Sequence, residues 1–300
     1  MVTVSVVIPT YNRADVISRA IDSILNQTYK DFEIIVVDDG STDYTEDVID
    51  SYSDNRLQYI KFDGNNGANA ARNEGIKQAD GKYISFLDSD DEFTNKHLEK
   101  VISTLSKSDS KIKGVYVSQV TIEHGEEQFS SSASEILSDP IQVIENYPAN
   151  GFSSFTFDKK VFKKVGSLDE GLKAFQDREF LIRYLSMYNL LPISDELVLY
   201  HTTGDRISSD PGRKISALEV LVEKHNKKIE TSNSAFLHYT RGHLYAKKQD
   251  MNSARKHFFS ASKGEPTSLK YHLHTISSLI GYNGYLFIQK LKEYIKYMGS

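Results

Sequence analysis

The sequence predicts an α/β fold, in which helices cover both faces of a mostly parallel sheet, followed by an α-helical C-terminal region. Over about the first 120 residues, short and almost continuously apolar segments alternate with segments of helical period. That alternation is typical of a parallel sheet buried on both faces. From about Pro211 to the end the pattern is helical. We therefore expect two domains, residues 1–210 and 211–300.

Each element of the first domain follows from its local pattern. Runs of β-branched and apolar residues predict strands at Thr3–Ile8 (ended by Pro9), Phe32–Val37, Leu57–Phe62, Tyr83–Leu87 and Gly114–Val120. Apolar residues at helical spacing predict helices at Ala14–Asn26, about 41–51, Ala68–Ala79 and Asn95–Ser106.

The pattern weakens after these elements. We expect Ser130–Ser134 to be an exposed, flexible connection, because it is almost entirely serine. Phe152–Phe157 and Leu190–Tyr200 are expected to be extended. Asp177–Tyr188 is expected to be an amphipathic helix with an apolar stripe formed by Phe180, Leu181, Tyr184 and Leu185.

Composition excludes several kinds of protein. The chain lacks cysteine, which rules out disulfides, thiolate metal sites and a cysteine nucleophile. Its N-terminus does not resemble a secretory signal, and no segment reaches the ~20 apolar residues that span a bilayer. We expect a cytoplasmic protein.

Charge is distributed unevenly along the chain. Residues 1–213 hold 22 Lys/Arg against 35 Asp/Glu, whereas residues 214–300 hold 14 against 6. The acidic part argues against nucleic acid as a ligand. The basic part indicates peripheral contact with anionic lipid at the inner face of a membrane, or a solvated lysine-rich surface. The aromatic and apolar residues near its end would touch that interface or form the core of a terminal helix pair; they are Tyr282, Tyr285, Leu286 and Phe287.

One segment of the C-terminal region has the spacing of a tetratricopeptide repeat, with small residues and aromatics at Gly242, Tyr245, Ala254, Phe258, Ala261 and Pro266. His238 stands where that repeat usually has a large apolar residue. A single unit cannot bury its own faces, so we expect it to pack on the helices that follow. A generic helical hairpin is the alternative.

The chemistry is expected at the carboxyl ends of the strands, where open α/β sheets bind ligands. The strand at Tyr83–Leu87 is followed by Asp88–Asp91, which places three carboxylates within four positions. Such clustering is unfavourable unless a cation compensates, and hard divalent cations suit carboxylate and phosphate oxygens. Polar segments at Pro9–Arg13, Asp38–Asp43 and Gly64–Gly75 follow the other strands. Alone, each segment is also typical of turns and helix caps.

Taken together, these segments resemble family 2 glycosyltransferases of the GT-A fold, the fold of nucleotide-diphospho-sugar transferases. The resemblance covers roughly Val4–Ser208, and its motifs are Val6–Arg13, Val36–Asp43, Gly67–Gly75, Phe86–Asp91 and, as supporting evidence, Val165–Glu170.

The resemblance implies a donor site and a metal site. The donor-binding residues would be Pro9, Thr10, Tyr11, Arg13, Asp39, Asn66, Arg72, Asp88 and Ser89. Among them, Thr10 would line the nucleotide base, Asp39 would accept a hydrogen bond from a uracil-type ring, and Arg72 would contact the base or the phosphates. Mn²⁺ or Mg²⁺ would be ligated by Asp90, by Asp88, which otherwise holds the ribose, and by His201, for which a structural role is the alternative.

The resemblance also implies a catalytic base. The family places an aspartate, usually preceded by glutamate, at the start of a helix, and here the matching segment is Phe175–Arg178. Asp177 would deprotonate the acceptor hydroxyl, with Gln176 in place of the usual glutamate and Glu179 as a second candidate. The alternative for Asp177 is a helix N-terminal residue favoured by the helix dipole.

The function implied is that of an inverting glycosyltransferase, which moves one sugar from a UDP-linked donor to a hydroxyl of a glycan or lipid-linked acceptor. The chain has no tryptophan, and therefore lacks the Gln-x-x-Arg-Trp motif of processive synthases. A nucleotidyltransferase and a non-catalytic glycan-binding or scaffold protein are the alternatives. Pro9–Arg13 contains no glycine for a phosphate loop, which argues against the first. The intact carboxylate cluster argues against the second.

Overall fold

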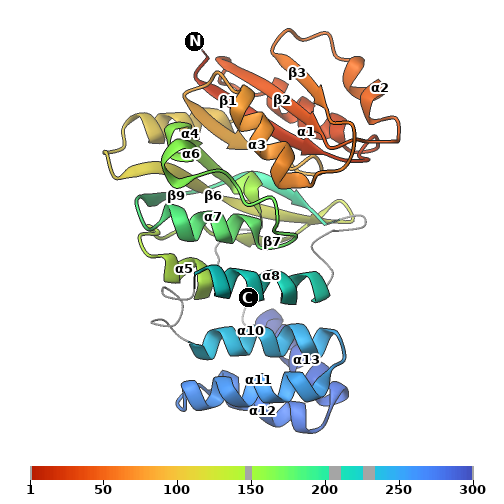
Figure 1. Cartoon of the computed structure of the whole chain (residues 1–300), viewed down its shortest axis with the longest axis vertical. Coiled ribbons are helices and arrows are strands. Elements are labelled where there is room, and N and C mark those ends of the chain that lie inside the picture. The colour runs from red at the N-terminus through yellow and green to blue at the C-terminus, as the bar shows by residue number, and fades with distance from the viewer. Residues whose placement is uncertain (1, 146–150, 203–210, 226–233, 299–300) are drawn as a thin grey trace. The chain divides into compact units, whose positions relative to one another are not determined.

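The computed structural model describes residues 2–145, 151–202, 211–225 and 234–298. Contacts along the chain define two compact units, the first made of Met1–Gly171 and Gln176–Gly204 and the second of Leu172–Phe175 and Asp205–Ser300. Figure 1 shows the first as a sheet flanked by helices and the second as helices. The expected domain boundary at 210/211 adjoins residues 203–210, which lie outside the description.

The first half of the sheet is parallel. Its strands lie in the order β3 (Leu57–Lys61), β2 (Phe32–Asp38), β1 (Val4–Thr10) and β4 (Tyr83–Phe86). All but β3 are fully or almost fully buried, as their continuous apolar sequences require. All four strands point the same way, so their carboxyl ends meet at one edge.

The second half mixes strand directions. It continues from β4 through β8 (Phe155–Asp158), β6 (Ile112–Glu123), β9 (Asn189–His201) and β5 (Glu92–Phe93), with β7 (Glu126–Ser131) paired to β6. Here only β6 and β9 are parallel, and the remaining pairs are antiparallel. The predicted α/β fold class is confirmed, with the parallel arrangement concentrated in the first four strands.

Helices cover both faces of the sheet (Figure 1). One apolar core holds residues of α3 (Ala68–Gln78), α5 (Pro140–Glu145), α6 (Lys160–Val165) and α7 (Gln176–Tyr184). The other holds residues of α1 (Ile17–Leu25), α2 (Thr45–Asp50) and α4 (His97–Ser106). β1 illustrates the division, because Val7 belongs to the first core whereas Val6 and Ile8 belong to the second.

Two local expectations are wrong. Pro9 does not end its strand: β1 continues to Thr10 in register with β2, although its pairing with β4 stops at Val7. Proline is tolerated there because one side of the strand has no ladder to join. Ser130–Ser134 is not simply an exposed connection, since Ser130 and Ser131 pair with β6 and Ala133 is buried. The backbone N–H of Ala133 donates to Ser118 Oγ, which fixes the end of the hairpin.

The amphipathic helix is confirmed, although it ends at Tyr184 rather than at Tyr188. The predicted stripe is buried, with Phe180, Leu181 and Tyr184 on the helix and Leu185 just after it. The short 3-10 helix η1 (Phe152–Ser154) precedes β8, where a longer strand is expected. Its backbone turn brings two serine hydroxyls toward the interior, and both are buried.

The second unit is helical, as predicted. It contains α8 (Pro211–Lys224), α10 (Ser234–Lys247), α11 (Met251–Gly264), α12 (Leu269–Leu279) and α13 (Tyr282–Met298). The tetratricopeptide-like hairpin is α10 with α11. A Cβ on Gly242 would lie 2.6 Å from the ring of Phe258, so glycine is what allows the two helices to approach. Tyr271 of α12 and Tyr285 of α13 complete the same apolar core. Among the described residues, no helix is both long and apolar enough to cross a bilayer.

His97 joins α4 to the sheet and makes stability depend on pH. Its Nδ1 lies 3.0 Å from the carbonyl oxygen of Leu197, its ring stacks on Phe93, and burial lowers its pKa from 6.5 to about 3. Between these two values the unfolded chain binds a proton that the folded chain does not, so stability falls as pH decreases.

We expect this histidine to cost the native chain about 2 kcal/mol of stability between pH 7 and pH 5. In His97→Gln, whose amide can still donate to Leu197, that loss should disappear. Urea unfolding followed by circular dichroism at pH 7, 6 and 5 measures it. The control, His124→Asn, changes an exposed loop histidine and should keep the native pH dependence. An unchanged pH dependence in His97→Gln would show that another group is responsible.

Candidate active site

The strands bring the predicted motifs to one edge of the sheet. Thr10 at the end of β1 lies in register with Asp38 at the end of β2. β4 flanks β1 on the other side, so Asp88–Asp91 follows from the neighbouring strand end. Pro9–Arg13, Asp39 and Asp88–Asp91 therefore emerge from adjacent strand ends of the first unit.

The loops after β1 and β2 are tied together by backbone-to-side-chain hydrogen bonds. The N–H of Asn12 donates to Ser41 Oγ at 2.8 Å, and Asn12 Oδ1 accepts from the N–H of Thr42 at 2.9 Å. The N–H of Arg13 donates to Thr45 Oγ1. Asn12 has a left-handed backbone (φ 51°), which asparagine tolerates better than most residues. The sequence predicted no such role for Asn12 or Thr45, although short polar side chains in a loop are the signal for such bonds.

The two aspartates after β2 both accept backbone hydrogen bonds. Asp38 accepts from the N–H of Ser41 and from the hydroxyl of Tyr59 at 2.7 Å; burial and then this contact raise the pKa of Tyr59. Asp39 accepts from the N–H groups of Asn66 and Gly67, at 2.6 and 2.8 Å. Asp39 therefore holds the loop before α3, where Gly67 has a positive φ. A carboxylate has about four acceptor positions, so capacity for a ligand remains.

Thr10 has a hydroxyl group that the rest of the described chain does not satisfy. The residue is 3% exposed, and within the described residues its Oγ1 has no hydrogen-bond partner. Buried hydroxyl groups are rarely left without a partner, and such an atom at a strand end is a candidate ligand contact. Tyr11 beside it is 39% exposed and available to pack against a ring.

Arg72 lies at the centre of the site. Its guanidinium donates to Asp88 Oδ1 at 2.6 Å, to Asn69 Oδ1 at 3.2 Å and to Gln176 Oε1 at 3.3 Å. It also stacks over the ring of Phe152, 4.5 Å from the centroid. Only 5% of the residue is exposed. α3 thus supplies a buried cation that links the acidic loop after β4 to the start of α7.

The acidic loop Asp88–Asp91 is held by the 3-10 helix η1 through Ser153. Ser153 Oγ accepts from the N–H of Asp88 at 3.0 Å and donates to Asp91 Oδ2 at 2.6 Å. Asp91 is fully buried; burial, and then the charges of Asp88 and Asp90, raise its pKa well above the usual range. Ser89 is also buried. Asp88 and Asp90 are partly exposed, so the loop places one buried and two partly exposed carboxyl groups close enough to repel one another.

The donor chemistry of the loop fits a hard divalent cation, since it offers carboxylate oxygens whose mutual repulsion a cation would relieve. Across the described ranges, however, no three His, Cys, Asp or Glu side chains converge closely enough to hold a metal ion by themselves. A cation there would need oxygen atoms from a ligand or water, as Mg²⁺ commonly does.

His201 is engaged by Glu92. Its Nε2 lies 2.6 Å from Glu92 Oε1, and its backbone N–H donates to Asp91 Oδ1. Burial, and then Arg19, lower the pKa of His201, against the opposing effect of Glu92. Metal ligation by His201 stays a prediction, because in this arrangement that ring nitrogen faces a carboxylate.

Arg19 of α1 is a residue that sequence reasoning missed. Its Nε lies 3.3 Å from Glu92 Oε1, and its Nη2 donates to the carbonyl oxygen of Asp90. Arg19 therefore supports the acidic loop from the side opposite Arg72. An arginine on a helix carries no local signal for such a contact, because its partner is 71 residues away in sequence.

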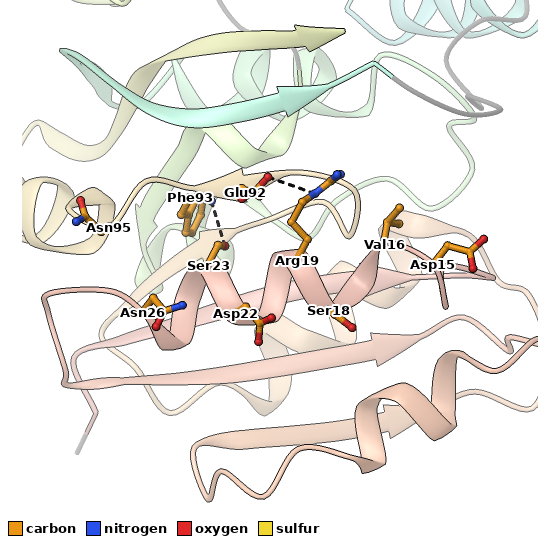
Figure 2. A pocket seen from close by; sticks show the side chains of 10 residues that line it. All are labelled: Asp15, Val16, Ser18, Arg19, Asp22, Ser23, Asn26, Glu92, Phe93 and Asn95. Atoms are coloured by element: carbon orange, nitrogen blue, oxygen red, sulfur yellow. Dashed lines mark hydrogen bonds and ion pairs between the residues drawn. The ribbon is translucent and has the colours of Figure 1, made fainter. Parts of the chain in front are cut away.

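A cavity of about 550 Å³ lies along α1 and β5, lined by Asp15, Val16, Ser18, Arg19, Asp22, Ser23, Asn26, Glu92, Phe93 and Asn95. Figure 2 shows the Arg19–Glu92 ion pair and the hydrogen bond from the N–H of Phe93 to Ser23 across it. None of the predicted donor or metal residues lines this cavity. Arg19 and Glu92, which do line it, also contact Asp90 and His201 of the candidate site.

The predicted base stands at the first turn of α7. Asp177 directly follows Gln176 in α7. The side chain of Gln176 accepts a hydrogen bond from Arg72, and Arg72 in turn pairs with Asp88. Asp177 Oδ1 accepts from the N–H of Arg178, which agrees with a helix N-terminal position as well as with a base. Glu179, the second candidate, is fully buried and paired with Arg183 at 2.7 Å.

Val165–Glu170 docks on α3. Asn73 exchanges two hydrogen bonds with the backbone of Leu168, and Asn69 donates to the carbonyl oxygen of Asp169 at 2.7 Å. Arg183 of α7 donates to the carbonyl oxygens of Val165 and Ser167. This segment connects the helix that carries Arg72 to the helix that carries Asp177.

Comparison with known proteins decides the family. Residues 5–166, more than half of the chain, match the family described as Glycosyl transferase family 2. The chain belongs to glycosyltransferase family 2. Membership confirms the resemblance of the motifs and argues against a nucleotidyltransferase.

Relatives in this family share parts of the chain. An uncharacterized glycosyltransferase of Rickettsia typhi is 36% identical over 191 residues, 61% of this chain and 58% of its own length. The chain thus spans under two thirds of that relative. The Escherichia coli protein named UDP-Glc:alpha-D-GlcNAc-diphosphoundecaprenol beta-1,3-glucosyltransferase WfaP is 41% identical over 138 residues, 42% of this chain and 55% of its own length.

Two solved structures have the same fold. Residues 1–349 of Staphylococcus aureus TarS, in complex with UDP-GlcNAc, superpose with a TM-score of 0.66 at 18% identity, covering 94% of this chain and 89% of that one. The mannosyltransferase PcManGT from Pyrobaculum calidifontis, in complex with GDP-Man and Mn²⁺, gives 0.59 at 20% identity, covering 97% and 84%. These glycosyltransferases confirm the GT-A fold of this family 2 member.

The Arg72–Asp88 pair should couple strongly. We expect a double-mutant cycle with Arg72→Met and Asp88→Asn to give about 1–3 kcal/mol of coupling in the free energy of unfolding, because the arginine is almost fully buried. Urea unfolding in the presence of a chelator measures it. The control cycle, Lys100→Met with Asp195→Asn, tests a half-exposed pair and should give about 0.2–1 kcal/mol. Equal coupling in the two cycles would contradict a central role for Arg72.

Proposed function

We propose that this chain is an inverting glycosyltransferase that moves one sugar from a UDP-linked donor to a hydroxyl group of a glycan or lipid-linked acceptor. The carrying observation is the cluster at the strand ends: a buried arginine, a carboxylate loop with unfavourable repulsion, and an unsatisfied threonine hydroxyl. A nucleoside diphosphate would offer anionic oxygens to Arg72 and polar atoms to Thr10, and a divalent cation bound with it would relieve the repulsion in the carboxylate loop. The UDP assignment draws support from the printed names of WfaP and the TarS complex.

In this proposal the donor lies over β1, β2 and β4. Pro9–Arg13 would frame the base, with Tyr11 packed on its face. Asp39 would use a remaining acceptor position for the uracil ring nitrogen, while it keeps Asn66 in place. Arg72 would approach the phosphates, and Asp88 and Ser89 would hold the ribose.

Asp88 and Asp90 would hold a divalent cation, Mn²⁺ or Mg²⁺, whose charge offsets the charge of the departing diphosphate. The Mn²⁺ in the PcManGT complex supports this assignment. Arg19 and Glu92 would keep the Asp90 backbone in position. His201, held by Glu92, would orient the end of β9 beside the loop or contribute to the cation's surroundings.

Asp177 would accept the proton of the acceptor hydroxyl group as that oxygen attacks the anomeric carbon and the bond to the diphosphate breaks. One displacement at that carbon inverts its configuration. Gln176 stands in place of the family's usual glutamate, and its amide oxygen accepts from Arg72, which ties the start of α7 to the acidic loop.

The acceptor class draws on the diphosphoundecaprenol-linked sugar in the name of WfaP. We place residues 1–210 as the catalytic domain, with 211–300 as a helical region that contacts the inner, cytoplasmic face of a membrane. The excess of Lys and Arg in that region supports this placement.

The test is release of nucleoside diphosphate from UDP-, GDP- and dTDP-sugars with Mn²⁺. The native chain should hydrolyse one UDP-sugar slowly without an acceptor, and Asp90→Ala should lower that rate by about 100-fold. Asp177→Asn should keep donor binding, measured by calorimetry, but lose about 10²- to 10⁴-fold in transfer once an acceptor is found.

The control Asp195→Asn removes a half-exposed carboxylate that pairs with Lys100 and should behave as native. Absence of both binding and release for all donors would overturn the donor site. Release that is unchanged in Asp90→Ala would overturn the metal assignment alone.

A further inference from the structure

The second unit has an apolar surface on the outside of α12. Five large aliphatic residues of this helix and its C-cap are 38–73% exposed: Leu269, Leu273, Ile276, Leu279 and Ile280. We call them the α12 face. Scattered exposed apolar residues are ordinary, but a group that is continuous along one helix marks an interaction site.

Helical geometry explains why these residues are together. Leu269, Leu273, Ile276 and Ile280 are spaced by four, three and four positions, so they follow one stripe of an α-helix. Tyr271, His274 and Ser278 face the other way and are buried in the unit. The helix is therefore held on one side by its own unit and presents a second apolar side.

The hydrogen bonds that attach α12 to its own unit do not involve the residues of the exposed stripe. Thr275 Oγ1 donates to the carbonyl oxygen of Phe258, and Arg255 Nη2 donates to that of Ser278. These bonds hold α12 against α11 through its buried side.

Tyr285, one of the two possible interface tyrosines, is 3% exposed and belongs to the core, whereas Phe287 on α13 is 65% exposed.

The charge of this part of the second unit is mainly positive. From Met251 to Lys290 the chain contains five Lys or Arg residues and one acidic residue, Glu265. Lys270 and Lys290 are exposed. On α11, Lys263 Nζ lies 4.7 Å from the ring centroid of Phe259, which is itself half exposed. Lys270 Nζ lies 4.4 Å from the ring centroid of Tyr239 in the core of the unit. An apolar stripe on a part of the chain with an excess of cations complements a layer of anionic headgroups over acyl chains.

We propose that the α12 face docks on a membrane that contains anionic lipid, with its aliphatic side chains entering the acyl boundary and the neighbouring lysines meeting the headgroups. A second copy of this chain would place cations against cations around the same stripe, which disfavours it. This inference rests on the proposed function, because it specifies where the chain contacts the membrane. Vesicle binding needs neither donor nor acceptor. The experiment below can therefore contradict the membrane contact without contradicting the transferase activity, and the reverse.

The experiment is flotation of the full chain with vesicles of phosphatidylcholine, with or without one third phosphatidylglycerol. The native chain should float with the anionic vesicles, bind the neutral ones much less, and be released by salt. Ile276→Ser with Ile280→Ser should weaken binding by at least about ten-fold. Lys290→Gln should weaken it about five-fold.

The matched control, Met187→Ser, removes an equally exposed apolar side chain (53%) from the first unit and should bind as native. Circular dichroism checks that each variant is folded. The proposal is overturned if the native chain does not bind anionic vesicles, or if the double variant binds as well as native. It is also overturned if sedimentation shows a native dimer that the double variant dissolves, because a second copy would then cover the face.

Discussion

The ion pair between Arg72 and Asp88 is the interaction on which the arrangement of the site depends. Three carboxylates follow β4, and Arg72 is buried among groups from α3, α7 and η1 that all approach them. Without that cation, repulsion within the loop would add to the cost of burying Asp91. The loop keeps its shape because Ser153 and Arg19 hold it at two further points. Each of these supports comes from a different element, so the site requires the whole first unit to be folded.

Much of the fold could be predicted because its central strands are buried on both faces and read as continuous apolar runs. The second half of the sheet was harder, since β7 is polar and lies at an edge, where Ser130 and Ser131 resemble a linker. The apolar stripe from Phe180 to Leu185 could be predicted because its residues recur at the spacing of one face of an α-helix. Pro9 misled the prediction of its strand end because its effect depends on whether a neighbouring strand is present on that side.

The site was predictable to the level of strand ends, since acidic and glycine-rich segments follow parallel strands in sequence and must meet at one edge. What could not be predicted are the contacts between distant elements. Ser153 lies 62 residues from the aspartate that it supports, and Gln176 lies 104 residues from Arg72. Serine and glutamine are common in loops and helices, so nothing local distinguishes these two. Their roles follow only from how β8 and α7 pack on the sheet.

The structural role of Asp39 affects how mutational data on this chain can be interpreted. Both of its oxygens already hold backbone N–H groups of the loop before α3. An asparagine there would present an NH₂ group to one of those donors, so the loop would shift even in the absence of any nucleotide. Loss of activity in such a variant would therefore not identify a contact with the base. Only a donor with an altered ring, tested on the unmodified chain, separates recognition of the base from maintenance of the loop.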